Sequence, residues 1–174
     1  MIIRNQRVVA FDIETTGLSP WQGARAIEIG AVAIKDGKVT DEFNSLINPE
    51  VPIPRSVQEI HGITEDILEG QPGPVTVFSD FHRFINDALL VAHNAKFDLN
   101  FLRAELANLG LGLANRNQCT LLMSRRQFPD LPNYRLATVA RYVLGGLPEN
   151  INRHRALDDA RLAAWVWLEM IKDD

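Results

Sequence analysis

The chain has 174 residues and a formal net charge of −4, with 46% hydrophobic and 23% charged residues. This ordinary composition excludes disorder, collagen and coiled coil, and it predicts one domain over residues 1–174. The single cysteine, Cys119, excludes an internal disulfide framework and a cysteine-rich zinc site. Residues 1–4 are too short an apolar run for a signal peptide, and no stretch approaches the roughly 18 apolar residues of a membrane span. We therefore expect a cytoplasmic protein with no membrane partner.

Positive charge gathers in residues 103–161, which carry nine basic and five acidic side chains. The net negative charge of the whole chain argues against a protein that coats nucleic acid nonspecifically. Two interpretations of the basic stretch are open: a solvated surface with some ion pairs, or a short track for phosphates. Its basic residues are Arg103, Arg116, Arg125, Arg126, Arg135, Arg141, Arg153, Arg155 and Arg161.

The first part of the chain predicts an antiparallel meander of three strands. Residues 7–13 and 26–34 are short apolar runs of the kind found in buried strands, and residues 38–47 alternate as a third strand. Between the second and third runs, Asp36 and Gly37 form a two-residue hairpin signal.

Irregular connections and helices follow the meander. Prolines at 49–54 and 72–74 interrupt the chain, with a short helix expected over 56–60, and residues 88–92 predict another buried strand. The other periodic segments predict helices over 75–86, 95–109, 120–128, 136–144 and 156–171. A hairpin start followed by crossovers predicts an α/β domain with a mixed central β-sheet flanked by helices.

Two acids stand at the end of the first predicted strand. Asp12 and Glu14 are two residues apart, so their side chains point to the same face of the sheet. Burying two like charges together is costly unless a cation compensates them. The alternative is that the strand end is exposed and the pair is merely polar.

Three further residues extend this acidic group. Asp98 lies in the first turn of a predicted helix after a buried strand, where a helix N-terminus also favours an acid for purely structural reasons. His154 and Asp159 are five residues apart, about 140° around an ideal helix. They converge only if His154 lies in the loop before the helix and Asp159 lies on its inner face.

Together, the four carboxylates and the histidine suggest a reaction. Four negative charges are balanced by two divalent cations, and ligation by oxygen alone points to Mg²⁺ or Mn²⁺. Two such ions close together are the arrangement that cleaves phosphodiesters by in-line displacement. A neutral histidine beside them can accept a proton from the attacking water near neutral pH.

The motifs FDIETTG (11–17), VAHNAKFD (91–98) and His154-x4-Asp159 resemble the three exonuclease motifs of the DEDDh 3′–5′ exonucleases. Within that family the chain most resembles the epsilon-type proofreading subunit or domain of bacterial DNA polymerase III. The resemblance covers essentially the whole chain, including the segment 52–64. It implies a ribonuclease H-like fold and a phosphodiester hydrolase that acts on the 3′ end of single-stranded or frayed DNA.

The resemblance also implies roles for individual residues. Asp12, Glu14 and Asp159 would hold one metal ion, Asp12 would bridge to a second, and Asp98 would act on the second. His154 would be the general base that activates a water molecule, and a nucleoside 5′-monophosphate would be released. The residues that would hold the terminal nucleotide are Thr15, Thr16, Gly17, Leu18, His61, His93, Asn94 and Phe97. For Phe97 the alternative is packing of its helix, and the two histidines also have a structural alternative.

Three questions stay open at this stage. Asp158 precedes Asp159, but the five-residue step from His154 favours Asp159 as the ligand. A DNA polymerase subunit is a candidate partner, although the chain shows no attachment tail after its last helix. An exoribonuclease that trims RNA or oligonucleotides with the same site, or a nucleic-acid-binding module that has lost catalysis, are the alternative functions.

Overall fold

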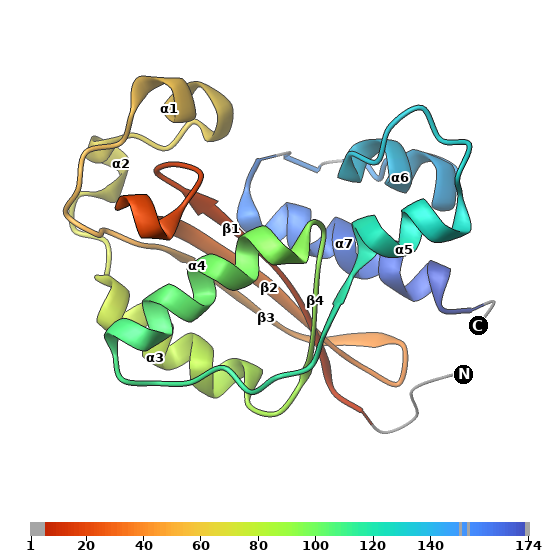
Figure 1. The fold of residues 1–174 in the computed structure, drawn as a ribbon, viewed down its shortest axis with the longest axis horizontal. Coiled ribbons are helices and arrows are strands. Elements are labelled where there is room, and N and C mark those ends of the chain that lie inside the picture. The colour runs from red at the N-terminus through yellow and green to blue at the C-terminus, as the bar shows by residue number, and fades with distance from the viewer. Residues whose placement is uncertain (1–5, 150, 153, 173–174) are drawn as a thin grey trace.

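The computed structural model describes residues 6–149, 151–152 and 154–172. Within these residues, five strands form one mixed sheet in the order β3-β2-β1-β4-β5. Neighbouring strands are antiparallel from β3 to β1 and parallel from β1 to β5 (Figure 1). The strands are β1 (Val8–Thr15), β2 (Ala26–Lys35), β3 (Lys38–Leu46), β4 (Leu89–Ala92) and β5 (Asn117–Cys119). The predicted fold class is confirmed.

The helices follow the predicted order, with small differences at their ends. They are α1 (Arg55–His61), α2 (Glu65–Leu68), α3 (Pro74–Ile85), α4 (Ala95–Asn108), α5 (Thr120–Gln127), α6 (Leu136–Val143) and α7 (Ala156–Met170). Three short elements were not predicted: β5, α2 and the 3₁₀-helix η1 (Pro20–Gln22). Each spans four residues or fewer, which is too short for a periodic pattern to appear in the sequence.

The hairpin between β2 and β3 forms as the sequence predicts. Asp36 and Gly37 have φ angles of 51° and 75°. Positive φ at both central residues is the signature of a type I′ turn, whose twist matches that of the flanking strands. The turn sets the first two pairs, Lys35 with Lys38 and Ile34 with Val39, and an irregularity between Ala33 and Ile34 then shifts the register by one residue.

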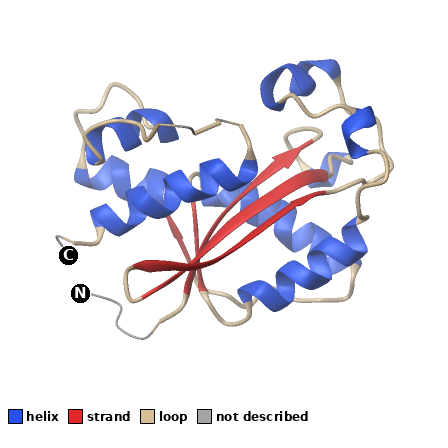
Figure 2. Cartoon of the chain, turned by 180° about the vertical axis from the view of Figure 1, so that it is seen from behind, coloured by secondary structure: helices blue, strands red, loops and turns tan. Residues whose placement is uncertain are grey.

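Helices cover both faces of the sheet (Figure 2). Val9, Phe11 and Ile13 of β1 pack in the core that includes α3 and α4. Val8 and Ala10 pack in a second core with α7. Because strand side chains alternate between faces, Asp12 and Glu14 lie on the α7 face of the sheet, as Ala10 does.

Gly30 of β2 lets α7 approach this face closely. A Cβ atom at position 30 would lie 2.1 Å from the backbone nitrogen of Leu157 and 2.3 Å from the carbonyl carbon of Ala156. No side chain fits there, so only glycine allows the first turn of α7 to rest on β2. Gly30 pairs with Asp12 across the two strands. The helix therefore begins directly beside the acidic end of β1.

Candidate active site

Asp12 and Glu14 stand on a part of β1 that has one open edge. The pairing of β1 with β2 continues to Thr15, whereas its pairing with β4 ends at Ala10. Beyond Ala10, the backbone of β1 on the β4 side is free to bond with other groups. The sequence prediction that both acids share a face is met by this register.

Asp98 occupies the open edge of β1. It lies in the first turn of α4 and is only 2% exposed. Its Oδ1 atom accepts a hydrogen bond of 3.1 Å from the backbone N–H of Ile13, between the two acids of β1. The short connection from β4 to α4 thus brings the third acid to the first two.

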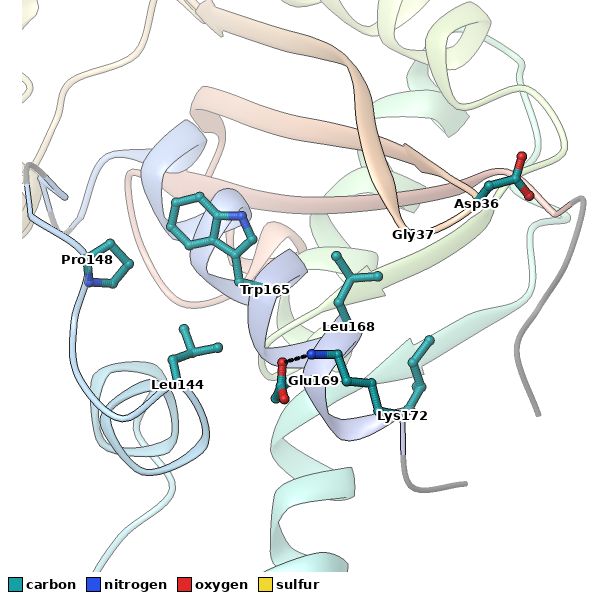
Figure 3. A pocket seen from close by; sticks show the side chains of 9 residues that line it. Asp36, Gly37, Leu144, Pro148, Trp165, Leu168, Glu169 and Lys172 are labelled. Atoms are coloured by element: carbon teal, nitrogen blue, oxygen red, sulfur yellow. Dashed lines mark hydrogen bonds and ion pairs between the residues drawn. The ribbon is translucent and has the colours of Figure 1, made fainter.

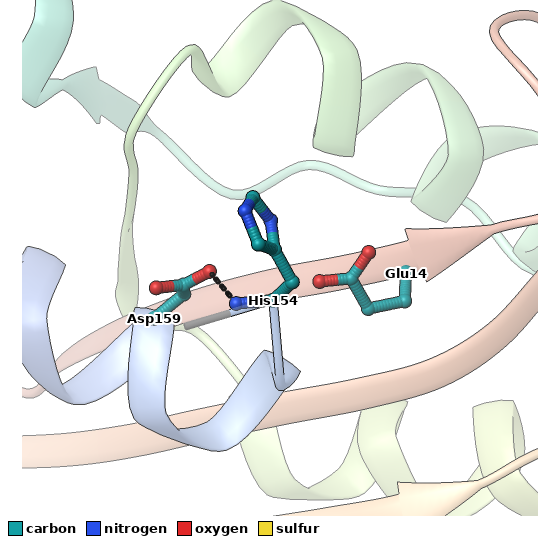
Figure 4. Close-up of side chains that lie close together, drawn as sticks. All are labelled: Glu14, His154 and Asp159. Carbon is teal, nitrogen blue, oxygen red and sulfur yellow. Dashed lines mark hydrogen bonds between the residues drawn. The ribbon is translucent and has the colours of Figure 1, made fainter. Parts of the chain in front are cut away.

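His154 and Asp159 approach from α7. His154 lies just before the helix, in the left-handed conformation with φ of 61°, and its backbone N–H bonds to Asp159 Oδ2 at 3.0 Å. One side-chain atom from each of Glu14, His154 and Asp159 lies within 4.8 Å of the other two. Figure 4 shows the three side chains converging from β1 and α7. The required geometry, with His154 in the loop and Asp159 on the inner face, is therefore present.

The acids of this group raise one another's pKa values. The pKa of Asp12 lies well above its ordinary range because burial disfavours the charge and Asp98, Glu14 and Asp159 repel it. Burial, with repulsion from Asp159 and Glu28, raises the pKa of Glu14 to about 7. Burial also raises the pKa of Asp98. A divalent cation among these carboxylates would offset both costs, so the residue set fits a metal centre.

Glu28 and Arg155 are two residues of this region that the motifs did not indicate. Glu28 pairs with Glu14 across the strands and is 1% exposed. Its carboxylate accepts hydrogen bonds from Arg155 Nε and Nη2 at 3.1 and 2.8 Å, and from the backbone N–H of Ala156 at 3.1 Å. Glu28 thus anchors the start of α7 and uses Arg155 as its counter-ion. The pattern that marks it is an acid inside an otherwise apolar strand, AIEIGAVAI.

Two arginines of the basic stretch at 103–161 form ion pairs with acids of the protein. Arg155 is bound to Glu28, and Arg161 is bound to Glu42 and Asp158. Both arginines therefore serve the fold, as the ion-pair interpretation expected. Arg153 lies outside the described residues.

The turn after β1 is held by its own threonines. Thr15 Oγ1 donates to the carbonyl of Gly17 at 2.7 Å, and Thr16 Oγ1 accepts from the N–H of Arg25 at 3.0 Å. A Cβ on Gly17 would lie 3.2 Å from Ala24 Cβ, which is a tight contact. Leu18 projects from this rigid turn and is 86% exposed.

His61 and His93 differ in how the protein uses their rings. His61 accepts from the N–H of Ile63 at Nδ1, and an interaction with the backbone of Thr15 opposes the effect of burial on its pKa. His93 has a partner at both nitrogens: Thr120 Oγ1 at 2.9 Å and the carbonyl of Tyr134 at 2.8 Å. Burial lowers the pKa of both histidines. Both rings are therefore neutral near pH 7, and His61 lies against the backbone of the turn after β1 while His93 lies against the segment before α6.

Asn94 and Phe97 flank the start of α4. Asn94 is exposed and left-handed, with φ of 67°, and Phe97 is half-buried with its ring 5.1 Å from that of Phe101. The packing expected for Phe97 is thus present, and part of its side chain remains exposed.

Comparison with known proteins identifies the family. A family model described as "RNase_T: Exonuclease" matches residues 9–166. The chain belongs to this exonuclease family. It is 40% identical over 166 residues to the DNA polymerase III PolC-type of Halalkalibacterium halodurans, covering 95% of the chain and 11% of that protein. It is 32% identical over 171 residues to the "3′-5′ exonuclease DinG" of Bacillus subtilis, covering 98% of the chain and 18% of that protein.

Solved structures agree with the sequence relatives. Exonuclease X in complex with 5′ overhanging duplex DNA matches with a TM-score of 0.76 and 26% identity, covering 97% of this chain and 92% of that one. The nuclease domain of 3′hExo, described as a DEDDh family member bound to rAMP, matches with a TM-score of 0.78 at 18% identity, covering 97% and 92%. The predicted resemblance to DEDDh exonucleases and to bacterial DNA polymerase III is confirmed.

Two general properties follow for this exonuclease. Exonucleases of this family and fold depend on divalent metal ions, and they bind nucleic acid. The chain spans between about a tenth and a fifth of the length of these two named relatives. Among the residues that the structure describes, no helix combines the length and apolarity needed to cross a membrane.

Proposed function

We propose that this chain is a 3′–5′ exonuclease that releases nucleoside 5′-monophosphates from single-stranded or frayed 3′ ends of DNA. The observation that carries the proposal is the convergence of Asp12, Glu14, Asp98 and Asp159, with His154, at the open end of β1. The direction and the DNA substrate are supported by relatives named as a 3′-5′ exonuclease and as DNA polymerase III.

The four acids are the metal ligands of this proposal, and the metal is two Mg²⁺ or Mn²⁺ ions. Asp12, Glu14 and Asp159 would hold one ion, and Asp12 would be shared with a second that Asp98 contacts directly or through water. Hard oxygen ligands suit these ions rather than zinc. When bound, the ions supply charge stabilisation for the attacking and leaving oxygens of the phosphodiester.

His154 is the proposed general base. Its ring extends from the loop before α7 and lies beside Glu14 and Asp159, while its backbone is fixed by the hydrogen bond to Asp159. A neutral imidazole ring can accept a proton from water on a ring nitrogen at physiological pH.

The terminal nucleotide is proposed to lie between the turn 15–18 and the start of α4. Leu18 and Phe97 offer apolar surfaces for the base and sugar, Asn94 offers hydrogen-bonding groups, and His61 supports the turn through the backbone of Thr15. Thr15, Thr16 and Gly17 shape the turn. His93, whose ring nitrogens are both bonded within the protein, is a positioning residue in this scheme.

The biological setting is also a proposal. We infer one exonuclease domain that acts in the cytoplasm on ends made by a DNA polymerase, because relatives similar to this chain are PolC-type polymerases. A polymerase subunit is the proposed partner. The corresponding expectation is faster removal of a mismatched 3′ nucleotide than of a paired one, because a mismatched end frays more readily.

The test is degradation of matched DNA and RNA strands carrying a 5′ label. With Mg²⁺ or Mn²⁺, we expect a ladder of DNA shortening from the 3′ end with release of mononucleotides. EDTA and the Asp12→Ala variant should each abolish the ladder. Faster degradation of RNA would assign the alternative exoribonuclease function. No degradation of either polymer with either metal would contradict the exonuclease mechanism and leave a nucleic-acid-binding module.

A further inference from the structure

A surface cavity adjoins the proposed site on the side of β5, the edge strand of the sheet. It has a volume of about 630 Å³ and lies between α4 and α5. Its lining consists of Asn94, Ala95, Lys96, Leu99, Arg103, Asn117, Cys119, Leu121, Leu122 and Arg125. None of the proposed metal ligands is among these residues, so the cavity is a separate feature of the surface.

The polar lining of this cavity is basic. Lys96 and Arg103 come from α4 and Arg125 from α5, while the described lining includes no acidic side chain. Lys96 and Arg103 are exposed and form no ion pair among the described residues. Arg125 lies over the ring of Tyr134, 5.6 Å from its centroid. In a chain with a net charge of −4, this cavity is a local concentration of available positive charge.

The basic cavity contrasts with another of similar size. A cavity of about 640 Å³ lies between the β2–β3 turn and the end of α7 (Figure 3). Its walls are mainly apolar side chains such as Trp165 and Leu168, and its charged residues are Asp36, Glu169 and Lys172, of which Lys172 is paired with Glu169. That cavity lies at the end of β2 opposite to Glu28, which pairs with Glu14 of the proposed site. It is therefore not placed to bind the phosphates of a strand whose 3′ end lies at the acids.

Asn94 connects the basic cavity to the proposed site. It lines the cavity and immediately precedes α4, whose first turn carries Asp98. Its left-handed backbone turns the chain from β4 into α4. The start of α4 thus contributes Asp98 to the proposed site and Asn94, Ala95 and Lys96 to the cavity. A strand whose terminal nucleotide reaches Asp98 can therefore continue past Asn94 over the three cations.

We propose that this cavity binds the phosphodiester backbone of the substrate strand on the 5′ side of the terminal nucleotide. The inference rests on the proposed function, because it takes the reacting 3′ end to lie at the acids. Lys96, Arg103 and Arg125 bind phosphates, and Asn117 adds a hydrogen-bonding group. These contacts read the backbone and not the bases, so they serve any sequence.

The first test removes two of the charges. The double variant Arg103→Gln/Arg125→Gln loses two phosphate contacts, each worth about 0.7 in the slope of log K against log salt for a single strand. Binding of a labelled 12-mer, measured with Asp12→Ala to prevent cleavage, should weaken about 25-fold at 0.1 M salt, with a slope shallower by about 1.4. The control Arg126→Gln/Arg141→Gln removes two exposed charges outside the cavity and should change neither value.

A small substrate separates this inference from the proposed function. The p-nitrophenyl ester of thymidine 5′-monophosphate has no further phosphate to reach the cavity. The double variant and the parent should hydrolyse it equally, while the variant degrades long strands with a raised KM. If the parent fails on both substrates, the proposed function is wrong. If the parent works and the variant matches it on long strands, the cavity proposal alone is wrong.

Cys119 offers a readout that does not depend on activity. It is the single cysteine of the chain and lines the cavity as a half-buried free thiol. Its reaction with a thiol reagent should slow when a single-stranded 12-mer is bound to the Asp12→Ala variant, and not with thymidine 5′-monophosphate. Equal reaction rates at saturating 12-mer, or protection only by a duplex, would overturn the assignment to the substrate strand.

Discussion

Two buried acids on α4, Asp98 and Glu105, are treated in opposite ways by the rest of the chain. Both are 2% exposed and they lie about two turns apart. Glu105 accepts from Arg25 Nε at 2.9 Å and Arg25 Nη2 at 2.8 Å. Within the described part of the chain, Asp98 accepts only from backbone N–H groups, those of Ile13 and of its own residue, and the charged groups near it are the acids Asp12, Glu14 and Asp159.

The acids of β1 and β2 also differ in whether the protein provides a counter-ion. Glu28 is bound to Arg155, whereas the neighbouring Asp12 and Glu14 form no ion pair among the described residues. The chain thus supplies its own cations to the acids that hold the fold together, Glu28 and Glu105, and in its described part supplies none to Asp12 and Glu14, which the proposed function assigns to a metal ion. A buried acid without a protein counter-ion is costly for folding, which is the mark of a functional group.

Asp98→Asn should have the largest effect on activity. The amide keeps an oxygen to accept from Ile13 but removes the charge, so we expect the exonuclease rate to fall about 10³-fold. Metal-free stability should stay the same or rise, because a buried like charge is lost. Rates with Mg²⁺ and thermal unfolding in EDTA at pH 8 measure the two effects. A large loss of metal-free stability would place Asp98 with the structural acids.

Gly30→Ala should have the largest effect on stability. The new methyl group would lie 2.1 Å from the backbone of α7, and backbone cannot give way as a side chain does. We expect a loss of about 3 kcal/mol or more in the free energy of unfolding, and lower activity as α7 moves from β1. Gly112→Ala is the control, because nothing lies within 4 Å of its added Cβ. Equal stability of the two variants would refute this account of how α7 is positioned.

Glu105→Gln tests the structural acid of the pair. The amide leaves Arg25 without its counter-ion, at a cost of about 2 kcal/mol, below that of a fully buried pair because Arg25 is partly exposed. Activity should fall less than with Asp98→Asn, because the proposed metal ligands are untouched. Urea unfolding of Glu105→Gln, Arg25→Met and the double variant gives the coupling energy. Additive losses would mean that the ion pair contributes little.

The fold was largely readable from the sequence because its periodic segments are long and apolar. The hairpin at Asp36–Gly37 and the helices over 95–108 and 156–170 carry local signals that their tertiary setting does not override. β5 is three residues long, and Asn117–Cys119 becomes a strand only because β4 lies beside it. Such an element depends on long-range pairing, which no local pattern reports.

The site was readable only in part. The motifs named the acids and placed His154 before α7, but not the partners of Arg155. A stretch rich in arginine does not reveal from its sequence whether each side chain pairs with a buried acid of the protein or is available to bind a phosphate. The structure shows that Arg155 binds Glu28, while Arg103 and Arg125 share a cavity. Gly30 likewise carries no sequence signal beyond a glycine within a strand.

The smallest predicted effect is on the pH dependence of metal-free stability. The pKa of Glu14 is raised from 4.5 to about 7 in the folded protein. As pH rises between these values, the unfolded chain loses this proton first, so the folded state binds more protons and loses stability. We expect a fall on the order of 1 kcal/mol, reduced by solvent at this half-buried group.

Unfolding by urea in EDTA at pH 5 and pH 8 measures this fall, and Glu14→Gln should reduce it. The difference between the two proteins reports Glu14 together with its repulsion of Asp12 and Asp98, because Glu14 contributes to the raised pKa values of both. Saturating Mg²⁺ binds the ionised acids and should cancel the fall in the parent, but less so in the variant. An identical pH dependence in both proteins would show that Glu14 is solvated and already ionised, and so belongs with neither group of buried acids.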